Sequence, residues 1–230
     1  MTTATFVSAN PTVLATQVGS FTPYNKVMLK QENGLPLDSR VFEKNKGLIF
    51  HYPYATTPCF LIDLEKPIHR NSDDEQQSTH SWPGGSGPNK SIVAFSAICT
   101  HRLSYPTRTA SFINFRSEKI SFRNHQNQSE TGTQLIHCCS ERSVYDPSKG
   151  GRVMGGPAPV ALTAIVLEYD SATDQFFATG TSGVEQYQQF FEKFSYRIKL
   201  DYQTQNIEQL TEKFSIAYPA DTFSTNRIQC

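Results

Sequence analysis

The sequence lacks an excess of either charge. Its 230 residues hold 21 Lys and Arg against 21 Asp and Glu, so the formal net charge is zero. Proteins that bind nucleic acids or anionic membranes usually carry a basic excess. The charge balance therefore argues against a dedicated nucleic-acid binder and against a protein that binds anionic membrane surfaces.

The sequence also lacks long hydrophobic runs. The longest, Ile92 to Cys99, is interrupted by Ser96 and is far shorter than the roughly 20 residues that span a bilayer. The first ten residues contain no basic segment followed by an apolar one, so they do not resemble a secretory signal peptide. From these two absences we expect a cytoplasmic protein with no transmembrane segment.

Cysteines are few, and their number is odd. There are five, which does not suit a framework of paired disulfides. Three of them, Cys99, Cys138 and Cys139, lie in two short clusters. This grouping favours metal or redox chemistry. Cys59 lies in an apolar segment and is expected in the core, whereas Cys230 is expected to be an exposed thiol.

Short apolar and aromatic segments separated by turn residues dominate the middle of the chain. Such spacing is typical of an all-β sandwich or barrel. The expected strands are 48–54, 58–64, 91–98, 111–116, 134–137, 161–169 and 175–179, with polar loops at 69–90 and 123–130.

After these strands the pattern changes to that of a helix. Val184, Tyr187, Phe191, Phe194 and Ile198 fall at helical spacings, so 182–198 is predicted to be an amphipathic helix that packs this stripe on the sheet. We therefore divide the chain into an N-terminal extension (1–45), a β domain (46–180) and a C-terminal helix and tail (181–230).

Three segments carry residues suited to metal chemistry. The first is Cys99-Thr-His101-Arg-Leu-Ser104, directly after a predicted strand. The second, which also follows a strand, is Cys138-Cys-Ser-Glu-Arg-Ser-Val-Tyr-Asp146, and the third is Gly155-Gly-Pro-Ala-Pro159. Their order resembles the Rieske iron–sulfur domain. That family uses Cys-x-His in one loop, Cys-x-x-His in a second loop, and a Gly-Pro-Ala-Pro loop over the cluster.

The resemblance covers roughly residues 47–180 and implies a fold, a cofactor and a set of ligands. The fold would be an all-β, Rieske-like sandwich or barrel with inserted cluster-binding loops. The cofactor would be a [2Fe–2S] cluster, with two thiolates on one iron and two imidazoles on the other. The resemblance places Cys99, His101, Cys139 and Arg142 at the metal, and Ser143, Tyr145, Pro157 and Pro159 around the cluster.

The second loop departs from the family pattern, because no histidine stands at the second imidazole position in either register. With Cys139 as the thiolate, which we prefer, Arg142 takes that position, and a guanidinium is a poor metal ligand. In the ungapped register Cys138 is the thiolate and Glu141 takes the position, offering a hard oxygen ligand. His137 and Cys138 are further candidates for the fourth ligand.

A second departure concerns the disulfide that joins the two loops in the family. Ser104 stands where a cysteine is common, and no spare cysteine fits in the second loop. The cluster is therefore expected to be either lost or held by an atypical ligand.

Two functions follow from these observations. The first is a Rieske-type electron-transfer protein or redox subunit that carries one electron between partner proteins. It would be an iron-containing component of an oxidoreductase system rather than a stand-alone enzyme. The alternative is a cluster-free relative that keeps the fold as a structural or interaction subunit, and the missing second histidine motivates it.

Overall fold

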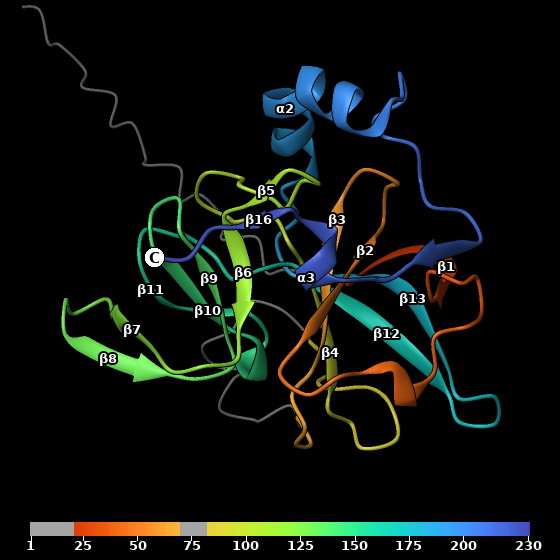
Figure 1. Cartoon of the computed structure of the whole chain (residues 1–230), viewed down its shortest axis with the longest axis horizontal. Helices are drawn as coiled ribbons and strands as arrows, with labels where there is room; N and C mark the ends of the chain where they lie inside the picture. The colour runs from red at the N-terminus through yellow and green to blue at the C-terminus, as the bar shows by residue number, and fades with distance from the viewer. Residues whose placement is uncertain (1–20, 70–81) are drawn as a thin grey trace, which may run out of the picture.

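The computed structural model describes residues 21–69 and 82–230. Most of the loop predicted at 69–90, and the whole N-terminal decapeptide, lie outside the described residues. The described part is mostly β, which confirms the expected fold class (Figure 1). The C-terminal helix spans 187–202, whereas the sequence predicted it over 182–198, because Ser182 still belongs to a strand.

The strands of the first half are β1 (Phe21–Lys30), β2 (Gly47–His51), β3 (Pro58–Asp63), β4 (Ile92–Ser96), β5 (Ala110–Ser111), β6 (Ile113–Arg116), β7 (Ile120–Arg123) and β8 (Ser129–Gly132). Those of the second half are β9 (Leu135–Cys138), β10 (Ser143–Asp146), β11 (Arg152–Gly155), β12 (Ala164–Asp170), β13 (Gln175–Ser182), β14 (Phe214–Ile216), β15 (Tyr218–Pro219) and β16 (Asn226–Arg227). The helices are η1 (Ser39–Val41), η2 (Pro147–Lys149), α2 (Tyr187–Tyr202) and α3 (Ala220–Phe223).

The larger sheet has the strand order β14-β1-β13-β12-β4-β3-β2-β15. Its two edge strands, β14 and β15, are separated in the chain by Ala217 alone. β14 runs parallel to β1 at one edge, whereas β15 pairs antiparallel with β2 at the other. The two edges are thereby brought together, and the sheet is nearly a closed barrel.

The smaller sheet has the order β11-β10-β9-β6 and lies beside the larger one (Figure 1). The hairpin β7–β8 extends from it and occupies part of the region predicted as a loop at 123–130. Ile120 and Phe122 are buried on one face of this hairpin with Leu135 and Val144. That apolar face accounts for a hairpin where the polar residues alone indicated a loop.

Two apolar cores lie on opposite faces of the larger sheet, as the alternation of side chains along β2 shows. Leu48 and Phe50 pack inside the near-barrel, whereas Ile49 faces the smaller sheet. Successive side chains of a strand point to opposite faces, so both faces of this sheet are covered. Cys99, Cys138 and Tyr145 belong to the core between the two sheets.

The three predicted segments of the chain all contribute strands to the larger sheet. β1, from the predicted N-terminal extension, pairs with β13, and the predicted boundary at 180 falls inside β13. β14 and β15 come from the predicted C-terminal segment. The segment boundaries therefore do not coincide with the limits of the sheets.

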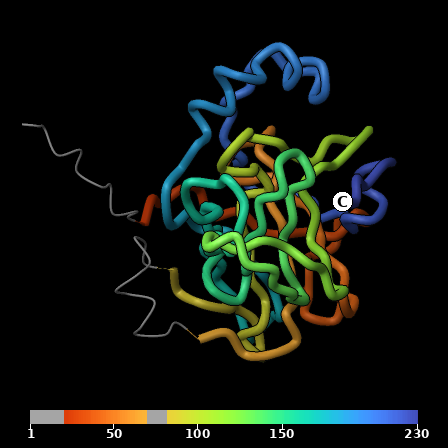
Figure 2. The backbone as a smooth tube through the Cα atoms, turned by 90° about the vertical axis from the view of Figure 1, so that its left-hand side faces the viewer, coloured from red at the N-terminus to blue at the C-terminus, as the bar shows by residue number. Residues whose placement is uncertain are grey.

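The helix α2 lies beyond the strands at one end of the molecule (Figures 1 and 2). Tyr187, Phe191 and Ile198 of the predicted stripe are on its side that packs against the rest of the chain. Their partners include Leu103 and Tyr105, from the loop after β4, rather than the face of the sheet. No helix within 21–69 and 82–230 is both long and apolar enough to cross a membrane.

Candidate metal centre

The first loop of the candidate centre turns back tightly after β4. The Cys99 amide donates to the Ser104 carbonyl at 2.9 Å, and the Leu103 amide donates to the Cys99 carbonyl at 2.8 Å. Leu103 has a φ of +59°, which is unfavourable for a branched side chain. Because the Leu103 side chain is buried against α2, packing offsets this backbone cost.

The helix α2 also binds the first loop through polar contacts, which the sequence did not predict. The Lys193 ammonium donates to the Arg102 carbonyl at 2.7 Å, and the Gln186 amide donates to the Thr100 carbonyl at 3.3 Å. The helix thus holds the loop that carries Cys99 and His101.

The second loop joins β9 to β10. His137 and Cys138 are consecutive in β9, so their side chains point to opposite faces of the smaller sheet. Cys138 points into the core that contains Cys99, whereas His137 lines a cavity on the other face. The alternation of β9 therefore determines which cysteine meets the first loop.

The third loop, Gly155 to Val160, touches both of the others. Gly156 has a φ of +82°, and a Cβ there would lie 2.4 Å from the Arg142 carbonyl oxygen. Only glycine permits this approach. At its other end the Val160 carbonyl accepts a hydrogen bond from the Thr100 hydroxyl at 2.7 Å. Pro157 and Pro159 are exposed on this loop.

The thiols of Cys99 and Cys138 form a buried pair. A hydrogen bond from Cys138 is the largest cause that lowers the pKa of Cys99, and burial opposes it. Hydrogen bonds from the Tyr145 hydroxyl and from the backbone of His101 and Arg102 also lower this pKa. The bond to Cys99 and burial together raise the pKa of Cys138. The pair is therefore arranged to hold negative charge on Cys99.

Cys59 provides the contrast, because it is also buried and outside the disulfide. Burial raises its pKa, and its thiol donates to the Tyr52 carbonyl at 3.0 Å. Burial alone therefore raises the pKa of a thiol. At Cys99 the hydrogen-bond donors outweigh burial, so the pKa is lowered.

The first and second loops also bring an imidazole and a carboxylate into contact. Nδ1 of His101 is 3.6 Å from Oε2 of Glu141. The other carboxylate oxygen accepts a hydrogen bond from Nε of Arg102 at 2.5 Å. The contact therefore joins the residue two positions after Cys99 to the residue three positions after Cys138.

Two buried polar atoms at this place have no hydrogen-bond partner among the described residues. They are Nδ1 of His101 and the hydroxyl oxygen of Ser143. Ser143 pairs with Cys138 across β9 and β10, so it lies beside the thiol pair. Buried polar atoms usually have a partner, so these two are available to a bound group or to water at this place.

These observations test whether the residues fit a [2Fe–2S] cluster. Cys99, Cys138 and His101 match the thiolates and one imidazole, and the partnerless Ser143 matches the donor to a bridging sulfide. Glu141 offers an anionic oxygen where the family has a neutral nitrogen. The site therefore fits an iron–sulfur group with one ligand changed.

The structure places two of the residues predicted at the metal elsewhere. Cys139 is bonded to Cys230 in a disulfide, and so its sulfur is not available beside Cys99. Arg142 lines the cavity that also contains His137 and Cys230. The arrangement follows the ungapped register, with Cys138 and Glu141 facing the first loop. The prediction of an exposed thiol at Cys230 is also wrong, because this residue is bonded to Cys139 in the same disulfide.

Tyr145 contacts the first loop, and Ser143 pairs with Cys138 across β9 and β10. The Tyr145 hydroxyl is 3.3 Å from the Cys99 sulfur and accepts a hydrogen bond from the Thr100 amide at 3.1 Å. When Ser143 and Tyr145 are aligned with the family pattern, no gap is needed between Cys138 and Ser143, and this alignment favours Cys138 as the thiolate.

Comparisons with known proteins add one finding. No protein-family model matches the chain. The chain is similar to the soluble domain of the Rieske protein II (soxF) from Sulfolobus acidocaldarius, with 26% identity and a TM-score of 0.44. That likeness covers 75% of this chain and 82% of the other.

Proposed function

We propose that the chain is a Rieske-type [2Fe–2S] electron-transfer protein with one atypical ligand. The observation that carries this proposal is the buried Cys99–Cys138 thiol pair beside the contact of His101 with Glu141. Cys99 and Cys138 would hold one iron, and His101 and Glu141 would hold the other. This set replaces the preferred set of the sequence, which contained Cys139 and Arg142.

The donor types suit this assignment. Thiolates bind iron–sulfur clusters, and imidazole binds iron. The cluster, when bound, supplies a carrier of one electron whose potential depends on its ligands, its charge and its hydrogen bonds. An anionic carboxylate in place of a neutral imidazole lowers that potential, since it stabilises the oxidised state.

The surrounding residues hold these ligands in place. Arg102 fixes the orientation of Glu141, and Tyr145 holds the Cys99 sulfur through its hydroxyl. Ser143 keeps a free hydroxyl donor beside Cys138. Hydrogen bonds of this kind stabilise the reduced state and raise the potential, so they act against the effect of the carboxylate.

A partner protein would exchange the electron at the outer side of this site. The side chains of His101 and Glu141 are 26% and 39% exposed, whereas the thiol pair is buried. A redox partner protein would therefore dock over these two residues.

Iron content tests the proposal. The chain, expressed with iron–sulfur assembly intact and purified anaerobically, should hold about two irons and two sulfides. Cys99→Ser and Cys138→Ser should lose both. Cys59→Ser is the matched control, because it also changes a buried thiol but lies in the other core, and it should keep the iron.

The opposite outcome supports the alternative function. Colourless wild-type protein without iron, folded to the same extent as Cys59→Ser, would overturn the electron-transfer proposal. The chain would then be a structural or interaction subunit that keeps the fold without the cluster.

A further inference from the structure

Beyond the proposed cluster, three potential ligands gather on the opposite face of the smaller sheet. A nitrogen of His137 and the sulfurs of Cys139 and Cys230 lie within 4.8 Å of one another. His137 is on the face of β9 that points away from Cys138, so this group is separate from the thiol pair. In the structure the two sulfurs are bonded to each other.

We propose that this group is a redox-controlled metal site, which takes a zinc-type divalent cation when the Cys139–Cys230 disulfide is reduced. His137, Cys139 and Cys230 would be three ligands, and water would be the fourth. Imidazole and thiolates are the ligands that Zn²⁺ prefers, and three protein ligands with one water is an established zinc arrangement.

The imidazole is already at the distance that such a site requires. Its two ring nitrogens lie 3.6 and 3.7 Å from the Cys230 sulfur. Zn–S and Zn–N bonds of about 2.3 and 2.0–2.1 Å in a tetrahedron separate the sulfur and the nitrogen by about 3.6 Å. The two sulfurs must move apart to about 3.8 Å. The Cys139 sulfur, which lies within 4.8 Å of an imidazole nitrogen, must also reach about 3.6 Å from it.

His137 has no other role in the described structure. The imidazole is buried, with 5% of its surface exposed. Among the described residues, its ring nitrogens contact no hydrogen-bonding atom except the Cys230 sulfur, which carries no hydrogen in the disulfide. A buried imidazole without a proper partner is costly unless it serves a ligand.

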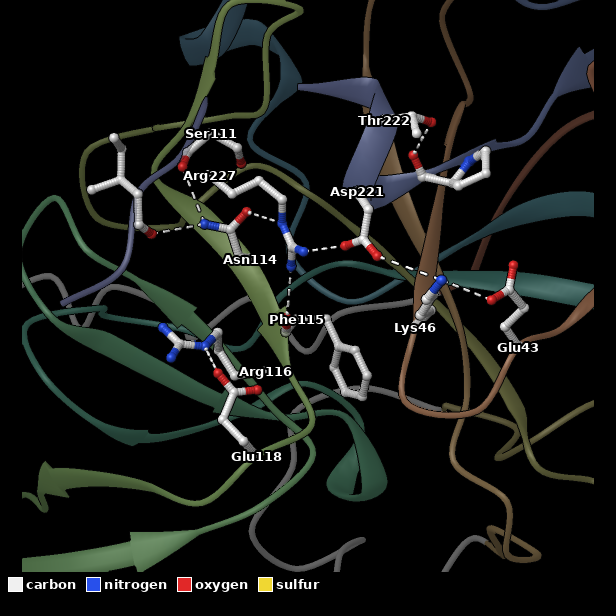
Figure 3. Close-up of polar contacts among 12 residues, drawn as sticks. Glu43, Lys46, Ser111, Asn114, Phe115, Arg116, Glu118, Asp221, Thr222 and Arg227 are labelled. Carbon is white, nitrogen blue, oxygen red and sulfur yellow. Dashed lines mark hydrogen bonds and ion pairs between the residues drawn. The ribbon is translucent and has the colours of Figure 1, made fainter. Parts of the chain in front are cut away.

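The end of the chain can open without disturbing the fold. Arg227 donates to the Asn114 side chain at 3.3 Å and to the Phe115 carbonyl at 3.2 Å, and it pairs with Asp221 (Figure 3). Asn114 in turn donates to the Ile228 carbonyl at 3.1 Å. These contacts hold the chain as far as Ile228. Cys230 lies two residues beyond them and is exposed, so its sulfur is able to move after reduction.

A cation and a water molecule have room at the group. His137, Arg142 and Cys230 line a cavity of 420 Å³ together with residues of the β7–β8 hairpin. The guanidinium of Arg142 would repel a bare dication. Two thiolates cancel the charge of the ion, so the complete site is neutral and does not carry that repulsion.

A dithiol reductant supplies the electrons that open the Cys139–Cys230 disulfide. Two electrons and two protons from the dithiol break the S–S bond, which leaves two thiols here and a disulfide in the reductant. Zn²⁺ then displaces the two thiol protons into solvent as the sulfurs bind it. Oxidation of the pair would reverse the sequence and release the ion.

Cobalt, as a spectroscopic probe of zinc sites, tests the proposal on the full chain. The protein is reduced with tris(2-carboxyethyl)phosphine, desalted anaerobically and titrated with Co²⁺. Reduced wild type should bind one equivalent more than oxidised wild type, with the visible absorption of tetrahedral thiolate-bound Co²⁺. Cys230→Ser should lose this equivalent. His137→Asn should lose it or shift the absorption.

The comparison with Cys230→Ser separates this site from the proposed cluster, because Cys99, Cys138, His101 and Glu141 are intact in both proteins. The test also avoids the effect of the disulfide on stability, since both proteins lack it after reduction. Equal cobalt binding by reduced wild type and reduced Cys230→Ser would overturn the proposal. Five titratable thiols in unreduced wild type, instead of three outside the disulfide, would overturn its redox control.

Discussion

The hydroxyl groups of Ser104 and Ser140 form a hydrogen bond of 2.7 Å between the two loops of the candidate metal centre. Ser104 stands where the Rieske family commonly has one cysteine of the bridge between its loops. Ser140 was not predicted as its partner. The hydrogen bond therefore links the two loops at Ser104, where the resemblance to the Rieske family implies a bridging cysteine.

This contact predicts that a disulfide can be built between the loops. In the double variant Ser104→Cys/Ser140→Cys the two sulfurs should pair without a change in the backbone. Closing a loop of 36 residues stabilises a protein by up to about 4 kcal/mol in the chain-entropy view. The urea midpoint should therefore be higher than in wild type when the variant is oxidised.

The measurement needs a thiol count and a control. Only the two new cysteines should pair, so the oxidised variant should titrate the same number of thiols as wild type. Each single variant should show no gain in stability. An oxidised double variant with two additional thiols would mean that the loops are farther apart than the Ser104–Ser140 contact indicates.

Tyr145 makes three contacts through one hydroxyl, and these predict the effect of Tyr145→Phe. The hydroxyl accepts from the Thr100 amide and contacts the Thr100 hydroxyl and the Cys99 sulfur. Its removal leaves the buried Thr100 amide without this partner, at a cost of about 1–3 kcal/mol. It also removes one of the hydrogen bonds that lower the pKa of Cys99, so that pKa should rise.

Both effects are measurable in cluster-free protein. Urea unfolding reports the stability, and the ultraviolet absorbance of the thiolate against pH reports the pKa. Tyr169→Phe is a suitable control, because Tyr169 also donates to a polar side chain, Asp174, but packs against the core inside the near-barrel rather than the core that contains Cys99. An unchanged thiolate titration in Tyr145→Phe would show that Cys138 and the backbone alone determine the pKa of Cys99.

The lowered pKa of His51 predicts that the folded protein loses stability in mild acid. The imidazole is partly buried, and desolvation together with the charge of Arg108 lowers its pKa to about 4 from an ordinary value of 6.5. The unfolded chain therefore binds a proton that the folded chain does not bind, between about pH 6.5 and pH 4. Stability falls as the pH falls through this window, by up to about 3 kcal/mol at its lower end.

A variant without a titrating group at this position isolates the effect. His51→Gln keeps a polar side chain that can reach the Tyr202 hydroxyl, which is 3.0 Å from the imidazole. The difference in urea midpoint between wild type and His51→Gln should change between pH 7 and pH 4, in favour of the variant. A constant difference would show that His51 titrates normally in the folded chain.

The strands of the core were predictable, because β-branched and aromatic runs such as 58–64 and 91–98 are bounded by turn residues. The helix was predictable from its aromatic period. Its partner surface was not, since the period shows which face of α2 is buried but not that Leu103 and Tyr105 cover it. Likewise, residues 21–30 have no strong apolar period, and their place in the sheet depends on pairing with β13.

The register of the second loop shows most clearly what could not be predicted from the sequence. The sequence analysis placed Cys99 and His101 at the candidate site, but it preferred Cys139 to Cys138 as the second thiolate. A local rule, the opposite directions of neighbouring side chains in β9, would have favoured Cys138 once Ile136 was placed in the core. The Cys139–Cys230 disulfide joins positions 91 residues apart, and no local sequence pattern predicts such a contact.

The last prediction decides between the two registers at the fourth ligand. Glu141→His should give a loaded protein with two imidazoles, whose EPR average g-value is low as expected for a Rieske centre. Its potential should be higher than that of wild type, because a neutral donor replaces an anionic one. Arg142→His should leave both properties unchanged, since residue 142 lines the cavity with His137 and Cys230.

Glu141→Gln separates the effect of charge from the effect of ligation. Its side chain has the same length as that of Glu141 but is neutral and a poorer iron ligand. If the carboxylate binds the metal, this variant should lose iron, whereas Glu141→His should keep it. If the carboxylate acts only through its charge, Glu141→Gln should keep its iron and show the same rise in potential. A Rieske-type spectrum in Arg142→His but not in Glu141→His would require Cys139 to leave its disulfide, and would restore the register with Cys139 and Arg142.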